Sequence, residues 1–419
     1  MTDARPVVGS VPAYDLAGED RVPWVLGTHL HPGAGPLARA PVGSRVCLIE
    51  AHDFARRKPY HHQKLTLLFS AMRQFRDDLR DRGYDVEYVR ADTFGDGLCT
   101  YADRHPGDTL VTMRSPSHGS EVRLRELVGD VPDLTVEFVE NDLFCSTRAA
   151  FDEWADGRAT PFRHEDFYRW MRRETGVLVD DGDPVGGAWN FDDETRESPP
   201  ADWDPPSILV PDHDALTREV DRWVGETFDA WGVPAFDGTA STADDGPDAD
   251  ESPDDDGPDA ADSFVWPVTR EGALDRLEHF CEERLPAFGP YQDAMRADDW
   301  AMAHSLLSPA VNLGLLHPWE VVTAIEDAAY DGDVPLNSAE GAVRQVLGWR
   351  EFTRHVYRHA MPGLATANQL GAERDLPGFY WTGETEMACV GGSVADVRER
   401  GYAHHLQRLM VLANFATLW

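Results

Sequence analysis

Short apolar runs alternate with a helical period through the first third of the chain. The apolar runs occupy residues 23–30, 44–50, 85–90, 109–113 and 134–137. Residues 63–82, between the second and third runs, repeat apolar side chains at helical spacing. Strands that alternate with helices form a parallel sheet with helices on its faces. The pattern therefore predicts an α/β domain over residues 21–145.

After residue 263 the apolar positions recur almost entirely at helical spacing. Helices are predicted at residues 269–284, 300–316, 318–331, 338–359 and 393–418. This pattern predicts an all-α domain over residues 264–419. The apolar run 409–419 continues to the last residue without a glycine cap, a basic last turn or a polar tail. We therefore expect the chain to end inside this domain.

Two further segments separate the predicted domains. Residues 146–235 mix helical stretches with turns rich in Trp, Pro and Asp, which is typical of a linker region that packs across both halves. Residues 236–263 consist mainly of Asp, Ala, Gly, Pro, Ser and Thr. Such a segment buries too little apolar surface to offset its chain entropy, so we expect a disordered acidic insertion.

The chain is strongly acidic, with a formal net charge of −37 from 75 acidic and 38 basic residues. Its only lysines are Lys58 and Lys64. A surface of carboxylates stays hydrated where strong salt screens charge repulsion, so the composition indicates a halophilic protein. An acidic protein that avoids nucleic acid is the alternative, because phosphates repel such a chain at low ionic strength.

Neither a leader peptide nor a membrane span is visible in the sequence. The first twenty residues lack a basic start followed by an apolar run, and no later stretch is long and apolar enough to span a bilayer. These features predict a cytoplasmic protein with no membrane partner. The five cysteines are widely scattered: Cys47, Cys99, Cys145, Cys281 and Cys389. They predict neither a zinc site nor a disulfide framework, and most should be small buried side chains.

Two serines three residues apart, Ser305 and Ser308, are followed by Pro309, as at a helix start. Hydroxyls and free backbone N–H groups at such a start can bind a diphosphate. A serine-capped helix without a ligand is the alternative interpretation.

One predicted helix carries Gln345, Trp349 and the charged residues of 351–354. An aromatic plane beside hydrogen-bonding groups suits a flat heterocycle and a nucleotide backbone. An ordinary amphipathic helix with an interfacial tryptophan explains the same pattern.

Two adjacent histidines, His404 and His405, stand at the start of another predicted helix. One can face a pocket while the other braces it, and either can act as a general acid near neutral pH. Adjacent histidines without a function are common, so this alternative stays open.

Together these segments resemble the flavin-binding half of the photolyase/cryptochrome superfamily, specifically its prokaryotic iron–sulfur branch of (6-4) photolyases and bacterial cryptochromes. The matching segments are PVTRE (267–271), FGPYQDAM (288–295), HSLLSP (304–309), VPLNSAEG (334–341), QVLGWREF (345–352), FYWTGETEMAC (379–389) and GYAHHLQRLMVLANFA (401–416). The match continues in the first half through residues 55–88, 167–176 and 183–192. Their order and spacing make the resemblance specific.

The resemblance implies a Rossmann-like α/β antenna domain joined to an all-α domain that holds FAD. The residues matching the contacts to the FAD ribityl-diphosphate are Tyr291, His304, Ser305, Leu306, Leu307 and Ser308, and those flanking the flavin are Gln345, Trp349 and Arg350. His405 matches the histidine that protonates a (6-4) photoproduct, with His404 beside it. Trp381 matches a member of the aromatic relay that photoreduces the flavin, unless it is a buried core tryptophan.

The resemblance also implies two further cofactors. A ribityllumazine antenna would lie between the strand ends of the first domain, at Gly27, Thr28, Leu30 and Glu50. Cys389 matches the first of four cysteine ligands of a [4Fe–4S] cluster, and this sequence lacks the other three. We therefore expect no iron–sulfur cluster and a helical domain that is incomplete at its C-terminus.

The function that the resemblance implies is light-driven, FAD-dependent repair of UV-damaged DNA. The expected lesion is the (6-4) pyrimidine photoproduct, which receives an electron from the excited reduced flavin. We expect a monomer whose partner is the damaged DNA. A cryptochrome photoreceptor and an inactive truncated remnant are the alternatives.

Overall fold

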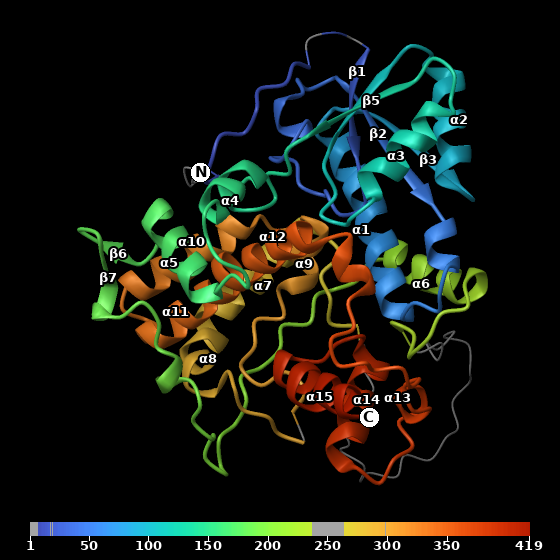
Figure 1. Ribbon diagram of the computed structural model, residues 1–419. Coiled ribbons are helices and arrows are strands. Elements are labelled where there is room, and N and C mark those ends of the chain that lie inside the picture. The colour runs from blue at the N-terminus through green and yellow to red at the C-terminus, as the bar shows by residue number, and fades with distance from the viewer. Residues whose placement is uncertain (1–6, 17, 19, 237–263, 298) are drawn as a thin grey trace, which may run out of the picture.

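The computed structural model describes residues 7–16, 18, 20–236, 264–297 and 299–419 (Figure 1). The predicted insertion at residues 236–263 lies outside the described residues except for its first residue. In Figure 1 the β-sheet lies at one end of the molecule and helices α13 to α15 at the other, with a layer of helices between them.

Five parallel strands form the central sheet in the order β3-β2-β1-β4-β5. They are β1 (Arg21–Val25), β2 (Arg45–Ala51), β3 (Asp85–Ala91), β4 (Thr109–Met113) and β5 (Thr135–Val139). Helices α1 (His62–Asp81), α2 (Phe94–Arg104) and α3 (Ser120–Gly129) cover its faces. The predicted α/β domain is thus confirmed, although β1 ends at Val25, before the turn at residues 27–28.

Alternation along β2 explains how the sheet is buried on both faces. Val46 and Leu48 pack in one core cluster together with Phe75 of α1. Cys47 and Ile49 point to the other face and pack in a second cluster, which includes residues of α2. A strand that is buried on both faces has a continuous run of apolar residues, and the run 44–50 predicted β2 in this way.

The region between the two halves contains three helices and a short hairpin. Its elements are α4 (Arg148–Ala155), α5 (His164–Thr175), β6 (Val179–Asp180), β7 (Asp183–Pro184) and α6 (Ala215–Thr227). Helix α6 packs on α1 of the first half, and α5 packs on a helix of the second half. We propose that residues 146–235 are the interdomain region. Single 3-10 turns complete the first half and this region: η1 (Leu37–Arg39), η2 (Asp53–Arg56), η3 (Val185–Gly187) and η4 (Asp192–Glu194).

The second half is helical, as predicted. Its elements are α7 (Arg270–His279), η5 (Phe280–Arg284), α8 (Leu285–Tyr291), α9 (Ser308–Leu313), α10 (Pro318–Tyr330), α11 (Leu336–Val343), η6 (Arg344–Arg350), α12 (Glu351–Ala360), η7 (Gly363–Thr366), α13 (Phe379–Thr382), α14 (Ala388–Arg400), η8 (Gln407–Ala413) and α15 (Asn414–Leu418). Segments η5, η6 and η8 are π-helical and continue neighbouring α-helices. Among the described residues, no helix is both long and apolar enough to cross a membrane.

Two of the predicted helices are wrong in extent. Residues 300–307 form turns, and only α9 of the predicted helix 300–316 is helical. The carbonyls of Met302 and His304 accept hydrogen bonds from the Arg284 guanidinium, so they are not used for helical N–H groups. The predicted helix 393–418 is interrupted at Gly401, whose φ of 64° ends α14.

Close backbone contacts join the sheet domain to the helical half. The Leu30 N–H donates to the Leu313 carbonyl at 2.9 Å. The next residue of the helical half, Gly314, has a φ of 87°, and a Cβ there would lie 3.0 Å from the Leu30 nitrogen. Glycine is required at this position by both the backbone angle and the close approach.

Candidate functional site

A cavity of about 410 Å³ opens in the helical half beside η6 and the segments that precede α9 and η8. Small-molecule sites usually measure about 300–1,000 Å³. Ten of the residues predicted from the sequence line it: His304, Ser305, Leu306, Leu307, Ser308, Gln345, Trp349, Arg350, His404 and His405. Three segments far apart in the sequence therefore meet at one cavity.

A second cavity, of about 470 Å³, lies between α1 and α7 and has an acidic lining that includes Asp77, Asp78 and Glu271. None of the residues predicted to be functional lines it. The cavity beside η6 is therefore the candidate site.

The π-helical segments of the described chain all border the candidate cavity. Phe280 of η5, Gln345 and Trp349 of η6, and Arg408 of η8 line it. π-helical turns occur often at functional sites, because the extra residue redirects side chains away from the regular helical positions.

A buried arginine shapes the loop that carries His304. Arg284 is fully buried and donates to the carbonyls of Met302 and His304 at 2.7 and 2.9 Å. It also donates to the carbonyls of Pro206 and Ser207 at 2.7 and 2.8 Å. Met302 and Leu306 have positive φ angles of 48° and 56°, which non-glycine residues rarely adopt. Arg284 holds this strained loop against the cavity.

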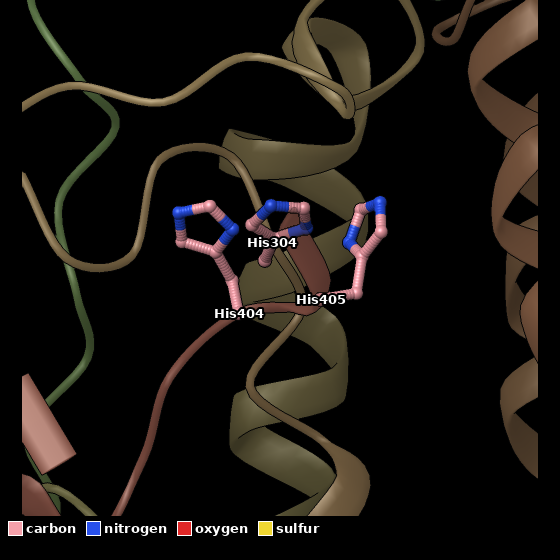
Figure 2. A group of neighbouring side chains, drawn as sticks. All are labelled: His304, His404 and His405. Atoms are coloured by element: carbon pink, nitrogen blue, oxygen red, sulfur yellow. The ribbon is translucent and has the colours of Figure 1, made fainter. Parts of the chain in front are cut away.

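Three histidines lie side by side at the edge of the cavity (Figure 2). The centroid of the His304 ring lies 4.9 Å from that of His404 and 5.2 Å from that of His405. Burial lowers the pKa of His404 to about 4, and burial together with its two neighbours holds the pKa of His304 well below its usual range. Both rings are therefore neutral near pH 7.

His405 differs from the other two because it has a charged partner. Its Nε2 lies 3.2 Å from Oδ1 of Asp293, and the side chains are 41% and 36% exposed. The hydrogen bond from His405 lowers the pKa of Asp293, against the opposing effect of burial. The carboxylate orients the imidazole.

An aromatic wall faces the same cavity. Trp349 is 44% exposed, and one face of its indole stacks on His164 of α5, with centroids 3.7 Å apart and planes within 5°. The stack fixes the orientation of the indole. Gln345, one turn earlier, also lines the cavity and donates from Nε2 to the Gly341 carbonyl at 3.1 Å.

Arg350 connects the cavity to the sheet domain. Its Nη1 donates to the Leu143 carbonyl at 3.1 Å, and its guanidinium lies 4.0 Å from the centroid of the Phe144 ring. The neighbouring Glu351 is fully buried and accepts hydrogen bonds from the backbone of Cys145 and Ser146 at 2.9 and 3.1 Å. The helix that lines the cavity is thus anchored to the end of the first domain.

Comparisons with known proteins bear on this site. A family model described as "Deoxyribodipyrimidine photo-lyase-related protein" matches residues 23–236. A (6-4) photolyase of Agrobacterium fabrum (strain C58) is 36% identical over 405 residues, which cover 94% of this chain and 74% of the relative. The chain belongs to the photolyase-related family. An uncharacterised protein of Acanthamoeba polyphaga mimivirus is 30% identical over 112 residues, which cover 26% of this chain and 85% of that protein.

A solved structure supports the fold of this photolyase-related chain. The crystal structure of a bacterial class III photolyase from Agrobacterium tumefaciens superposes with a TM-score of 0.55 at 16% identity, covering 96% of this chain and 73% of that one. The parallel sheet followed by a helical half is therefore the photolyase fold, and the predicted fold class is confirmed.

Two residues that were predicted for the flavin site or its aromatic relay lie outside the cavity lining of this photolyase-related chain. Tyr291, at the end of α8, packs its ring on Trp203 with centroids 5.0 Å apart. Trp381 is 58% exposed, and its ring contacts Trp231 at 6.4 Å. The interpretation of Trp381 as a buried core residue is therefore wrong, whereas its place in an aromatic relay stays a prediction.

The predicted antenna residues lie where adjacent strands end. Gly27 and Thr28 form the turn that follows β1, and Glu50 lies near the end of the neighbouring strand β2. Leu30 and Glu50 are fully buried, and Thr28 is exposed. The cavity beside neighbouring His29 holds only about 10 Å³, which is the space of one water molecule. An antenna chromophore at these residues stays a prediction.

Cys389 lies at the start of α14 and is exposed. The expectation that most of the cysteines are buried is wrong, because only Cys47 and Cys145 are buried, whereas Cys281 is half-buried and Cys99 is exposed like Cys389. Among the described residues, Cys389 belongs to no group of three metal-ligating side chains. The cysteines of this chain therefore do not fit a four-thiolate cluster.

Several side chains that shape the site had no signal in the sequence. Asp293 and Tyr402 lie inside the matching segments, but no pattern marks them. Arg284 belongs to a charged stretch that reads as an exposed helix face, and His164 is distant from Trp349 in the sequence. Only the three-dimensional contacts distinguish these residues.

Proposed function

We propose that the chain repairs UV-damaged DNA with light, that FAD bound in the η6 cavity is its cofactor, and that its substrate is the (6-4) photoproduct. The main support is the meeting of Ser305 and Ser308, Trp349 and His405 at one cavity of a photolyase-related protein. The 36% identity to a (6-4) photolyase supports the choice of lesion.

The lining residues fit a flavin nucleotide. Ser305 and Ser308 bring hydroxyls, and Asn312 and Gln345 bring amides, to the same cavity. Trp349 offers an aromatic edge whose orientation is fixed by His164. Apolar side chains from α8 and α10, among them Phe288, complete the wall. In this proposal the hydroxyls bind the diphosphate and η6 flanks the ring system.

The protein's own part in the reaction is to bind the flipped lesion, exclude water and move one proton. The chemistry that a bound, reduced and light-excited flavin supplies is a single electron for the lesion. The repair of a (6-4) photoproduct also moves a hydroxyl between two bases, which requires a positioned acid. His405 meets this need better than His404, since the Asp293 carboxylate orients the His405 ring, whereas burial lowers the pKa of His404 to about 4. The buried and unpartnered His404 would remain neutral and position its neighbour.

Positive charge at the cavity supports a nucleotide partner. Arg350 and Arg408 line it in a chain whose formal net charge is −37. Because the overall charge repels phosphates, we expect DNA binding to depend on these local guanidiniums and on salt that screens the remaining surface.

Repair of a defined lesion tests this function. The full chain, loaded with FAD and reduced, is illuminated with blue light in the presence of an oligonucleotide that contains one (6-4) photoproduct. We expect restored pyrimidines in the light and none in the dark. His405→Ala should lower the repair rate by about 10²–10⁴-fold while bound FAD persists, because general acids typically contribute that factor. His118→Ala, at an exposed position of the first domain, is the control.

The outcomes separate the alternatives. Bound FAD that photoreduces without any repair would overturn the repair proposal and favour a photoreceptor. Failure to retain FAD would refute the cofactor site. Repair by His405→Ala at the parent rate would show that the acid is another group.

A further inference from the structure

The three histidines beside the cavity have a second property that is independent of a flavin. Among the described residues, they form the one group of three or more His, Cys, Asp or Glu side chains whose ligand atoms all lie within 4.8 Å of one another. The rings come from two segments about a hundred residues apart, the loop before α9 and the start of the helix that continues as η8. Figure 2 shows the His304 ring between the other two, with a ring nitrogen of His405 directed toward it.

We propose that His304, His404 and His405 bind one divalent transition-metal ion of the Zn²⁺ class when no lesion occupies the cavity. The bound ion would take the lone pair of His405 and so exclude the acid role proposed for this residue. The metal-bound state and the repair-competent state are therefore mutually exclusive. Three neutral imidazoles with an open fourth position form a common tetrahedral zinc set. Imidazole nitrogens select Zn²⁺, Ni²⁺ or Cu²⁺ over Mg²⁺ and Ca²⁺, which prefer oxygen ligands. The adjoining cavity leaves space for a water molecule as the fourth ligand.

Unpaired nitrogens are the second observation that points to a ligand. Within the described part of the chain, Nε2 of His304 and both ring nitrogens of His404 are buried without a hydrogen-bond partner. The residues are only 7% and 1% exposed. A buried polar atom left unpaired costs about 1–3 kcal/mol, so three such atoms at one place favour a bound partner. A single metal ion satisfies one nitrogen of each ring.

Asp293 completes the arrangement that metal-binding histidines usually have. Nε2 of His405 donates to the Asp293 carboxylate at 3.2 Å, which leaves Nδ1 as the free lone pair. Carboxylates in this outer position fix the tautomer and raise the basicity of the ligating nitrogen. The Arg284 guanidinium is a nearby positive charge that would repel a bound cation. It already donates hydrogen bonds to four backbone carbonyls, whose dipoles partly offset its charge.

The distances require only small side-chain movements. Nitrogens that bind one tetrahedral Zn²⁺ at about 2.0–2.1 Å lie roughly 3.4 Å apart. Ligand atoms now within 4.8 Å must therefore approach by about 1.4 Å at most, and rotation of exposed His405 supplies part of this movement. His304 cannot move far, because Arg284 holds its carbonyl.

Metal titration of the flavin-free, chelator-treated full chain tests the site. Calorimetry with Zn²⁺ should show one high-affinity ion per chain, and Co²⁺ should give the visible absorption of a tetrahedral complex. Mg²⁺ should neither bind nor compete. His304→Ala and His404→Ala should each abolish the Co²⁺ spectrum, and Asp293→Asn should weaken Zn²⁺ binding by about 10–100-fold.

His29→Ala is the matched control. In the described residues, His29 is also buried with both ring nitrogens unpaired but belongs to no such group. This variant should bind Zn²⁺ like the parent. X-ray absorption of the Zn²⁺-loaded parent keeps the test valid if a variant fails to fold: three imidazole nitrogens at about 2.0 Å are expected. Sulfur ligands, fewer than three imidazoles or no stoichiometric binding would overturn the proposal. None of these readouts requires FAD or repair.

Discussion

Replacing Glu50 by Gln should destabilise the sheet domain strongly. The Glu50 carboxylate is fully buried at the end of β2. Arg73 binds it with two hydrogen bonds, at 2.9 and 2.7 Å, and Arg90 donates at 3.0 Å. The Tyr88 hydroxyl donates as well. Glutamine keeps the shape but removes the charge, which leaves the buried Arg73 guanidinium uncompensated.

Two estimates of the loss agree. Breaking a buried ion pair by removing one partner typically costs about 3–5 kcal/mol. Burial alone would raise the pKa of Glu50, but the hydrogen bonds from Arg73 and its other partners outweigh burial and lower that pKa from 4.5 to about 2. A difference of that size corresponds to about 3 kcal/mol in the free energy of unfolding.

The same pKa fixes the pH dependence. Because the folded-state pKa lies below the unfolded value, the contribution of Glu50 is present above about pH 4.5 and is lost as the pH falls toward 2. The stability difference between the parent and Glu50→Gln should therefore be about 3 kcal/mol at pH 7 and shrink below pH 4.5.

Urea unfolding followed by circular dichroism, at one high salt concentration, measures this difference. The matched control is Asp78→Asn, which removes an exposed i,i+4 pair with Arg82 at 2.8 Å on α1. Such pairs contribute about 0.3–0.5 kcal/mol. A Glu50→Gln loss as small as that of Asp78→Asn, or a loss that does not change with pH, would refute the assignment of Glu50 as the buried centre of an ionic cluster.

Three other substitutions test the architecture of the site. Arg284→Met should lower the free energy of unfolding by more than about 3 kcal/mol, because it leaves four carbonyls without their donor. A variant that unfolds at the same urea concentration as the parent would contradict this. Gly314→Ala should lower the free energy of unfolding by about 1–3 kcal/mol in the same assay, since φ is 87° and the new Cβ would lie close to the Leu30 nitrogen. An unchanged urea midpoint would show that the backbone at this contact adjusts without loss of stability. Trp349→Ala should lower FAD retention about tenfold by flavin absorbance while the fold persists, whereas full retention would remove Trp349 from the proposed flavin wall.

The sheet could be predicted from the sequence because its signal is local. Runs such as 44–50 and 109–113 are apolar on both faces, and that pattern belongs to buried parallel strands. The prediction of a helix over 300–316 was wrong because the apolar residues of 300–307 are buried in a loop, not on a helix face. Arg284 binds the carbonyls of Met302 and His304, and this contact between distant segments decides the local backbone.

The site was predictable to the extent that short segments carry its residues. Ser305, Gln345 and His404 stood out as polar or aromatic residues at helix starts and on helix faces, and all three line the cavity. The pairing of His405 with Asp293 joins positions 112 residues apart, so neither spacing nor periodicity could reveal it. Trp381 shows the converse, since its residue type suited a core but its neighbours leave it exposed.

The distribution of arginine explains how so acidic a chain holds a polar interior. Arg172, Arg276 and Arg284 are each almost completely buried and donate to backbone carbonyls rather than to carboxylates. A planar guanidinium with five donors satisfies several carbonyls at once, which lysine cannot do. Among the described residues, six arginines and six carboxylates are buried, so the buried charges cancel and the formal net charge of −37 belongs to the rest of the chain. In the proposed function, a polyanionic substrate would be recognised where guanidiniums such as that of Arg408 line the η6 cavity, because this local positive charge offsets the repulsion from the acidic chain.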